Sequence, residues 1–264
     1  MDSSLENLWR RRHLLWILVV SNIKRQNKNN FLGYLWWWLD PLLMTGVYFF
    51  MVYVLFRARS KEYPYLLYLV SGILPWKALA DSLGQSVGIL RSHASIIRAI
   101  GFPKAVLPLS MTISNIIYFF FSVVVLLVLG LVYDEQWNTW PGWQLLWLPV
   151  VSALQVAFTA GLALLVSAAG VFFLDLSNIL GHLLRMWMYL SPVIYPVSLI
   201  PEQLFGLYRL NPMYAYLGAY RDIFVFAQSP SVWSLGYGTL ASVVMLSFGM
   251  LVFRRLEGKV VQRL

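Results

Sequence analysis

Long apolar stretches, separated by short charged segments, dominate the pattern of the chain. A helix needs about 20 mostly apolar residues to cross the roughly 30 Å hydrocarbon core of a bilayer. Six stretches of about this length occur, at residues 34–56, 65–85, 107–132, 147–174, 178–196 and 232–253. We therefore predict an all-α membrane protein with six transmembrane helices, which form one transmembrane domain over residues 34–264.

The fourth of these spans, 147–174, is unusually rich in Ala, Ser and Gly. Small side chains let helices approach one another closely in lipid, where packing replaces the hydrophobic effect as the force between helices. We therefore expect this span to lie inside the helix bundle.

The residues before the first span carry a different pattern. Between residues 5 and 28 apolar side chains recur at helical spacing, and basic side chains cluster at both ends of the segment. Such a pattern is typical of a helix that lies on the membrane surface. We predict an amphipathic interface helix within a cytoplasmic N-terminal unit of residues 1–33.

The segment 197–231 fits neither a simple span nor an ordinary loop. Pro201, Pro212 and Pro230 interrupt it, yet the stretches between them are largely apolar or aromatic. Interrupted backbone is tolerated at membrane depth only where protein or a water-filled cavity surrounds it. This pattern predicts short re-entrant helices before the last span.

Composition agrees with a membrane protein and excludes several other classes. The chain is 59% hydrophobic and 12% charged, whereas soluble domains carry about 25% charged residues. It has no cysteine, so thiolate metal sites and cysteine nucleophiles are excluded. No zinc-binding, nucleophile-elbow or phosphate-loop motif occurs, so we expect no metal, no bound cofactor and no enzyme activity of this chain.

The distribution of Lys and Arg predicts the orientation. With a cytoplasmic N-terminus, thirteen of the twenty basic residues fall on the cytoplasmic side and five on the outer side. Cytoplasmic loops collect Lys and Arg, so we predict a multi-pass protein of the cytoplasmic (inner) membrane with both termini in the cytoplasm.

Four charged residues fall within or beside predicted spans: Asp40, Lys77, Asp81 and Arg185. Charges in a membrane are costly unless they are paired or hydrated, so each is a functional candidate. Lys77 and Asp81 are four residues apart and can pair on one helix face. Asp40 and Asp81 can instead lie at the interface, and Arg185 either reaches the headgroups or faces an internal conduit.

Aromatic residues crowd the first and fifth spans, among them Trp36, Trp37, Tyr189 and Tyr195. One interpretation is the aromatic belt found at both membrane interfaces. The other is that some of them line a pore, because flat rings with a polar edge suit the apolar faces and hydroxyl edges of sugars.

Several motifs, in this order along nearly the whole chain, resemble those of the ABC-2 type exporter permeases. They are Asn30-Phe31-Leu32-Gly33-Tyr34-Leu35-Trp36 followed by Asp40-Pro41-Leu42; Gly72-Ile73-Leu74-Pro75-Trp76; Ile100-Gly101-Phe102-Pro103-Lys104 with Pro108; Tyr189-Leu190-Ser191-Pro192-Val193-Ile194-Tyr195-Pro196; Asn211-Pro212-Met213; and Phe253-Arg254-Arg255-Leu256-Glu257. Members of this family export lipid-linked O-antigens, capsular polysaccharides and wall teichoic acids. The chain departs from the family in having Asp40 before the first-span proline and Leu174-Asp175 in place of the usual Arg-Asp after the fourth span.

The resemblance implies a homodimer whose subunits each bind a cytoplasmic ATPase subunit, with ATP and Mg on that partner. It also implies that residues 92–104 form the coupling segment and that residues 197–231 form the outer gate. We expect the ATPase to contact Ser92, Ile96, Ile97, Arg98, Phe102 and Lys104. We expect an undecaprenyl-linked polymer, entering from the membrane, to meet Arg25, Lys28, Trp36, Trp37, Asp40, Arg185, Tyr189 and Tyr195.

Two other functions stay open at this point. One is a drug or small-lipid efflux permease of the same superfamily. The other is an integral-membrane enzyme that acts on lipid-linked sugars. The lack of a convincing acid, base or metal cluster argues against this second function.

Overall fold

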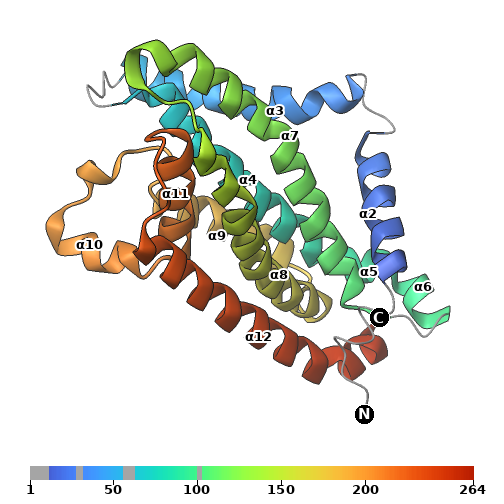
Figure 1. Ribbon diagram of the computed structural model, residues 1–264. Helices are drawn as coiled ribbons and strands as arrows, with labels where there is room; N and C mark the ends of the chain where they lie inside the picture. The colour runs from blue at the N-terminus through green and yellow to red at the C-terminus, as the bar shows by residue number, and fades with distance from the viewer. Residues whose placement is uncertain (1–11, 28–31, 56–62, 100–102) are drawn as a thin grey trace.

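The computed structural model describes residues 12–27, 32–55, 63–99 and 103–264, and all regular structure within them is helical (Figure 1). The α-helices are α2 (Arg12–Asn27), α3 (Trp36–Phe49), α4 (Tyr65–Val87), α5 (Ile89–Ser92), α6 (Ala94–Ala99), α7 (Val106–Trp137), α8 (Leu148–Phe172), α9 (Leu176–Tyr189), α10 (Glu202–Arg209), α11 (Pro212–Phe224) and α12 (Val232–Arg263). A π-helical segment, η2 (Phe50–Leu55), continues α3, and three short 3₁₀ turns are η1 (Gly33–Leu35), η3 (Trp143–Trp147) and η4 (Val197–Leu199). The predicted all-α class is confirmed.

Five helical segments of the described chain are long and apolar enough to cross a bilayer: Gly33–Tyr53, Tyr65–Val87, Val106–Trp137, Trp143–Phe172 and Val232–Arg263. The other predicted span, 178–196, is helical only as part of α9. That helix has 14 residues and is therefore about 21 Å long, less than the hydrocarbon core. It ends before Ser191-Pro192, because proline cannot donate the next helical hydrogen bond. The count of six is thus not confirmed.

Helices α4, α7, α8 and α12 form a bundle and run in roughly the same direction across Figure 1; α4 and α8 are its more buried members, whereas α7 and α12 are largely exposed. The small-residue helix α8 packs against all three of the others, as predicted for an interior span. The N-terminal helix α2 packs on α7, where Val19 is buried and Asn22 donates a hydrogen bond to the Ser110 hydroxyl (3.1 Å).

Glycine allows the closest contacts between these helices. The backbones of α8 and α12 touch at Gly161 and Gly249, where a Cβ on either residue would overlap main-chain atoms of the other helix. At Gly170, α8 lies equally close to the carbonyl of Val87 at the end of α4. Close approach of this kind strengthens dispersion contacts along the helices, which is how helices associate in lipid.

The chain turns sharply after α9, and other helices satisfy the backbone of this turn. Three consecutive carbonyls accept hydrogen bonds from side chains: that of Val193 from Arg221 (2.9 Å), that of Ile194 from the Tyr65 hydroxyl (2.6 Å) and that of Tyr195 from Tyr68 (3.4 Å). An unsatisfied carbonyl costs several kcal/mol in hydrocarbon, so these donors make a non-helical turn tolerable at this depth.

Asn211 joins the same turn to α11. Its side chain accepts hydrogen bonds from Trp187 (3.0 Å) and from the Met213 amide (3.1 Å), and it donates to Ser191 (2.7 Å). The second of these bonds caps α11, for which Asn followed by Pro is a favoured start. The segment 197–231 consequently contains two short helices, α10 and α11, in agreement with the predicted broken structure.

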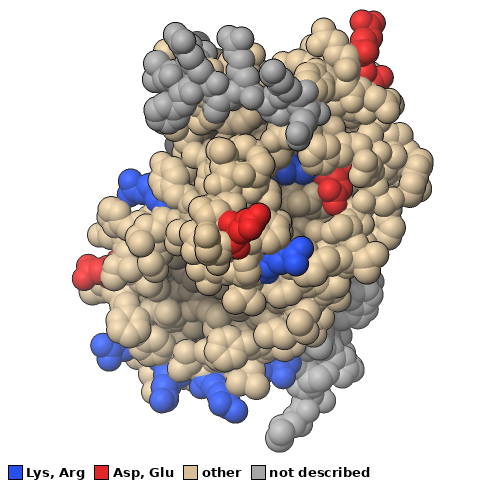
Figure 2. All heavy atoms as spheres, turned by 90° about the vertical axis from the view of Figure 1, so that its left-hand side faces the viewer, with Lys and Arg blue, Asp and Glu red and all other residues tan. Residues whose placement is uncertain are grey.

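Lys and Arg side chains gather at the lower edge of Figure 2, at the end of the bundle where α12 finishes in Figure 1. The opposite end carries α10, α11 and the connection between α7 and α8. We refer to these as the basic end and the outer end of the molecule.

Two glycines of α12 offer a matched test of the close packing. Gly249→Ala should lower stability by about 1–3 kcal/mol, because the added methyl group has to displace the backbone of α8. Gly236→Ala, where nothing lies within 4 Å of a Cβ, should leave stability unchanged or raise it by up to about 1 kcal/mol. Unfolding of the two purified variants by heat in detergent measures the difference. Equal melting temperatures would contradict the glycine contact.

Candidate functional site

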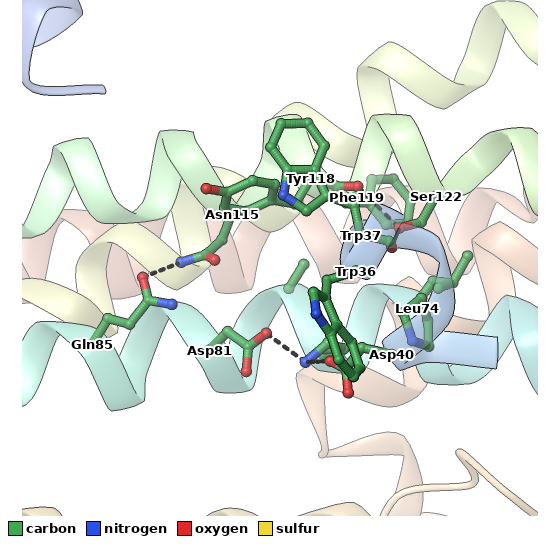
Figure 3. Close-up of a pocket in the computed structure, with 13 residues that line it drawn as sticks. Trp36, Trp37, Asp40, Leu74, Asp81, Gln85, Asn115, Tyr118, Phe119 and Ser122 are labelled. Carbon is green, nitrogen blue, oxygen red and sulfur yellow. Dashed lines mark hydrogen bonds and ion pairs between the residues drawn. The ribbon is translucent and has the colours of Figure 1, made fainter. Parts of the chain in front are cut away.

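A polar pocket of about 230 Å³ lies between α3, α4 and α7 (Figure 3). Its walls combine charged and amide side chains with tryptophan and tyrosine rings, in a part of the chain that is otherwise strongly apolar. The lining residues are Trp36, Trp37, Asp40, Pro41, Leu74, Lys77, Ala78, Asp81, Gln85, Asn115, Tyr118, Phe119 and Ser122. Three predicted site residues, Trp36, Trp37 and Asp40, thus come together here.

A charge triad occupies one side of the pocket. The Lys77 ammonium lies 2.8 Å from a carboxylate oxygen of Asp81 on its own helix and 2.8 Å from one of Asp40 on α3. The three side chains are 33–47% exposed, so water at the mouth of the pocket shares in their solvation. The predicted pairing of Lys77 with Asp81 is confirmed, and the second bridge, to Asp40, ties α3 to α4.

The facing wall belongs to α7, and it supplies polar groups that the sequence analysis missed. Asn115 donates to the Gln85 side chain (3.0 Å) and Ser122 to the Trp37 carbonyl (3.2 Å). The Tyr118 hydroxyl is buried and has no hydrogen-bond partner among the described residues. Asn115, Tyr118 and Ser122 follow one another at intervals of three and four, which places them on one face of α7. This row of polar residues within an otherwise apolar span could have predicted the polar wall from the sequence.

A second cavity, of about 570 Å³, lies toward the basic end and is bounded by Arg25, Asn22, Ser92 and Gln85, among others. Gln85 lines both cavities, so its hydrogen bond with Asn115 lies at the boundary between them. Arg25, predicted at the entrance, is exposed beside this cavity, whereas Lys28 falls outside the described residues.

The remaining predicted channel residues lie elsewhere. Arg185 and Tyr189 are exposed on α9, where the Arg185 guanidinium donates to the Gly181 carbonyl (3.3 Å). The Tyr195 hydroxyl donates to the Tyr189 carbonyl (2.9 Å) and lies 2.9 Å from the Tyr208 hydroxyl. None of these three lines the polar pocket.

The predicted coupling segment, 92–104, begins at the last residue of the short helix α5 and contains α6, at the basic end (Figure 1). Ser92 and Arg98 are exposed there. Ile97 is buried in a hydrophobic cluster with residues from the start of α7 and the end of α12. Lys104 forms an ion pair with Glu257 of α12 (3.1 Å). The Ile96 side chain and Phe102 lie outside the part that the structure describes.

Comparison with known proteins gives consistent matches. The model of the ABC-2 type transporter family matches residues 13–225. The chain is similar to the O-antigen export system permease protein RfbA of Myxococcus xanthus, with 32% identity over 92% of both chains. It is also similar to the RfbA protein of Klebsiella pneumoniae, with 29% identity over 80% of both chains, and to the polysialic acid transport protein KpsM of Escherichia coli, with 22% identity over 86% of both.

The charge triad makes a prediction about stability. Lys77→Met leaves two carboxylates facing each other without their cation, and should destabilise the protein by about 1–3 kcal/mol. The triple variant Asp40→Asn, Lys77→Met, Asp81→Asn removes all three charges and should recover most of that loss. Thermal unfolding in detergent compares the two. A triple variant no more stable than Lys77→Met would show that the two bridges do not act as one unit.

Proposed function

Since the chain belongs to the ABC-2 type transporter family, we propose that it is the membrane permease subunit of an ATP-driven exporter for a lipid-linked cell-surface polysaccharide. The observation that carries the proposal is the similarity to an O-antigen export permease over 92% of both chains. The polysialic acid transporter among the relatives favours the same class of cargo, a long sugar polymer.

The polar pocket suits this cargo. Sugar hydroxyls pair well with carboxylates and amides, and the apolar faces of sugar rings pack on tryptophan and tyrosine. Asp40, Asp81 and Asn115 supply the polar groups, Trp36 supplies an exposed ring, and Tyr118 offers its unpartnered hydroxyl. In our proposal the pocket is a transient contact for sugar units as they pass.

Export against a gradient requires an energy source, and this chain has no phosphate-binding loop. We assign that role to a separate cytoplasmic ATPase subunit, with ATP and Mg bound on that partner. Its docking surface would include α5 and α6, where Ser92 and Arg98 are exposed, with the buried Ile97 fixing α6 to the bundle. This places the basic end, and both chain termini, in the cytoplasm, in line with the distribution of Lys and Arg.

We propose a homodimer in which the path for the polymer lies between two copies of the chain. Large apolar side chains are exposed on α3 and the start of η2, and others on α9. They are Leu42, Leu43, Met44, Val47 and Phe50 on α3 and η2, and Ile179, Leu183, Met186, Tyr189 and Leu190 on and after α9. In a dimer these faces would meet the second copy or the passing lipid-linked chain. Arg185 and Tyr189 would then face the path.

The division of labour between subunits is testable through ATP hydrolysis. The isolated chain should show no ATPase activity, and its cognate ATPase should co-purify with it and hydrolyse ATP in the complex. Arg98→Glu should reduce co-purification by at least about tenfold, because it reverses an exposed charge at the proposed surface. Arg98→Lys, which keeps the charge, should retain binding. Robust hydrolysis by the isolated chain would overturn the proposal.

The sugar contact is testable through export. Trp36→Ala removes an exposed ring of the pocket and should lower export of the polymer by about 3- to 10-fold, the value of one ring contact. Trp143→Ala, at an exposed ring outside the pocket, is the matched control and should export normally. Surface polymer is measured by immunoblot, and dimer assembly by crosslinking. Undiminished export by Trp36→Ala would place that ring in the lipid belt instead.

A further inference from the structure

A third cavity, of about 480 Å³, lies at the outer end between α4, α10, α11 and the start of α12. Figure 2 looks at the molecule from the side of α10 and α11, where a few charged side chains stand among uncharged ones. Two arginines, Arg209 and Arg221, line this cavity together with Tyr68, Tyr214 and Trp233. Basic residues are uncommon on the outer side of membrane proteins, so two in one cavity require an explanation.

Arg221 is 3% exposed and is only partly satisfied by the protein. Its guanidinium lies 3.7 Å from the centre of the Tyr68 ring, and one nitrogen donates to the Val193 carbonyl (2.9 Å). The Nε atom is buried without a hydrogen-bond partner, and no carboxylate of a described residue forms an ion pair with this side chain. A buried cation without a counter-charge is costly, so this position of Arg221 favours a bound anion.

Arg209 supplies the second positive charge from an exposed position on α10. Its guanidinium stacks over two rings, 5.0 Å from the centre of Phe205 and 5.6 Å from that of Trp233. These contacts hold its donors in place at the mouth of the cavity, which reduces the entropy lost when a ligand binds.

Asp222 is the one carboxylate that lines the cavity among the described residues. One of its carboxylate oxygens accepts a hydrogen bond from the Ser231 amide (3.0 Å), which partly offsets its negative charge. Burial raises the pKa of this carboxyl, and the Ser231 hydrogen bond opposes that rise. With both arginines charged, the cavity carries a net positive charge even when Asp222 is ionised.

Exposed apolar side chains neighbour two of the lining residues in the chain, Arg209 and Trp233. Leu207 and Leu210, on either side of Arg209 in the chain, are 65% and 66% exposed, and Val232, beside Trp233, is 88% exposed. Leu207 and Leu210 are three residues apart and therefore lie on one side of the helix end. This arrangement suits a ligand with an anionic head and hydrocarbon chains better than a small free anion.

We propose that this outer cavity binds the phosphate headgroup of an anionic lipid, with Arg209 and Arg221 as its ligands and the lipid chains lying against Leu207, Leu210 and Val232. The planar donors of arginine match phosphate oxygens in pairs, which makes phosphate the fitting anion. Binding of this kind rests on the cavity alone and is independent of the proposed export function.

Native mass spectrometry of the full-length protein in a neutral detergent tests the proposal. Phosphatidylglycerol is titrated into the wild type, Arg209→Gln and Arg254→Gln, and diacylglycerol and inorganic phosphate are titrated in parallel. Arg254 is an exposed arginine at the basic end and provides the matched control. Melting temperatures without lipid verify that each variant is folded, which Arg209→Gln should be, since that side chain is exposed.

We expect one phosphatidylglycerol per subunit to bind the wild type and Arg254→Gln with similar affinity, and Arg209→Gln to bind it about tenfold more weakly, the value of a charge-assisted hydrogen bond. Diacylglycerol should bind at least tenfold more weakly than phosphatidylglycerol to the wild type. Equal affinity for the two lipids, or equal loss in both variants, would overturn the proposal. Inorganic phosphate that competes as strongly as the lipid would overturn the lipid part of it and leave a site for a free anion.

Discussion

Interrupted backbone inside a membrane has to find its hydrogen bonds within the protein, and this constraint organises the outer half of the molecule. The turn after α9 leaves three carbonyls outside any helix, and Arg221, Tyr65 and Tyr68 satisfy them from two other helices. Glycine fits at position 72 because a Cβ there would overlap the Val193 carbonyl and the Arg221 guanidinium. The turn therefore fixes how close α4 and α11 approach, and with that the shape of the outer cavity.

The contacts that α8 makes with its neighbours depend instead on close packing of backbone against backbone. Gly161 and Gly249 bring the backbones of α8 and α12 into contact, and Gly170 brings α8 against the end of α4. Helices α3 and α9 lie outside these contacts and expose large apolar side chains, as the outward faces of α7 and α12 also do. The close backbone contacts are thus concentrated around α8, while apolar faces are exposed on the helices that surround it.

Much of this fold was predictable from sequence. Apolar length alone located the long helices, and the small residues of 147–174 correctly placed α8 in the interior. The prolines also located the broken segment, because a missing N–H is a local property. The short α9 was harder to foresee: its apolar run continues through Val193 and Ile194, which are buried in a turn rather than a helix.

The candidate site was predictable only in part. Trp36, Trp37 and Asp40 were identified as candidates, but their partners on α7 depend on how two helices pack, which a single sequence does not specify. The Lys77–Asp81 bridge follows from helical spacing, whereas the Asp40 bridge crosses between helices. Arg221 is one of the five basic residues assigned to the outer side from the sequence, and nothing local to it indicated a buried side chain against a tyrosine ring.

The double pairing of Lys77 has a consequence for movement. A lysine with a single partner on a neighbouring helix locks the two helices together, since separating them would strand an unpaired cation in the bilayer. Lys77 keeps Asp81 on its own helix, so if α3 swings away, the ammonium remains neutralised and the released Asp40, already 47% exposed, turns toward water. Separating α3 from α4 therefore breaks one ion pair, between Lys77 and Asp40, and leaves no unpaired lysine in the bilayer.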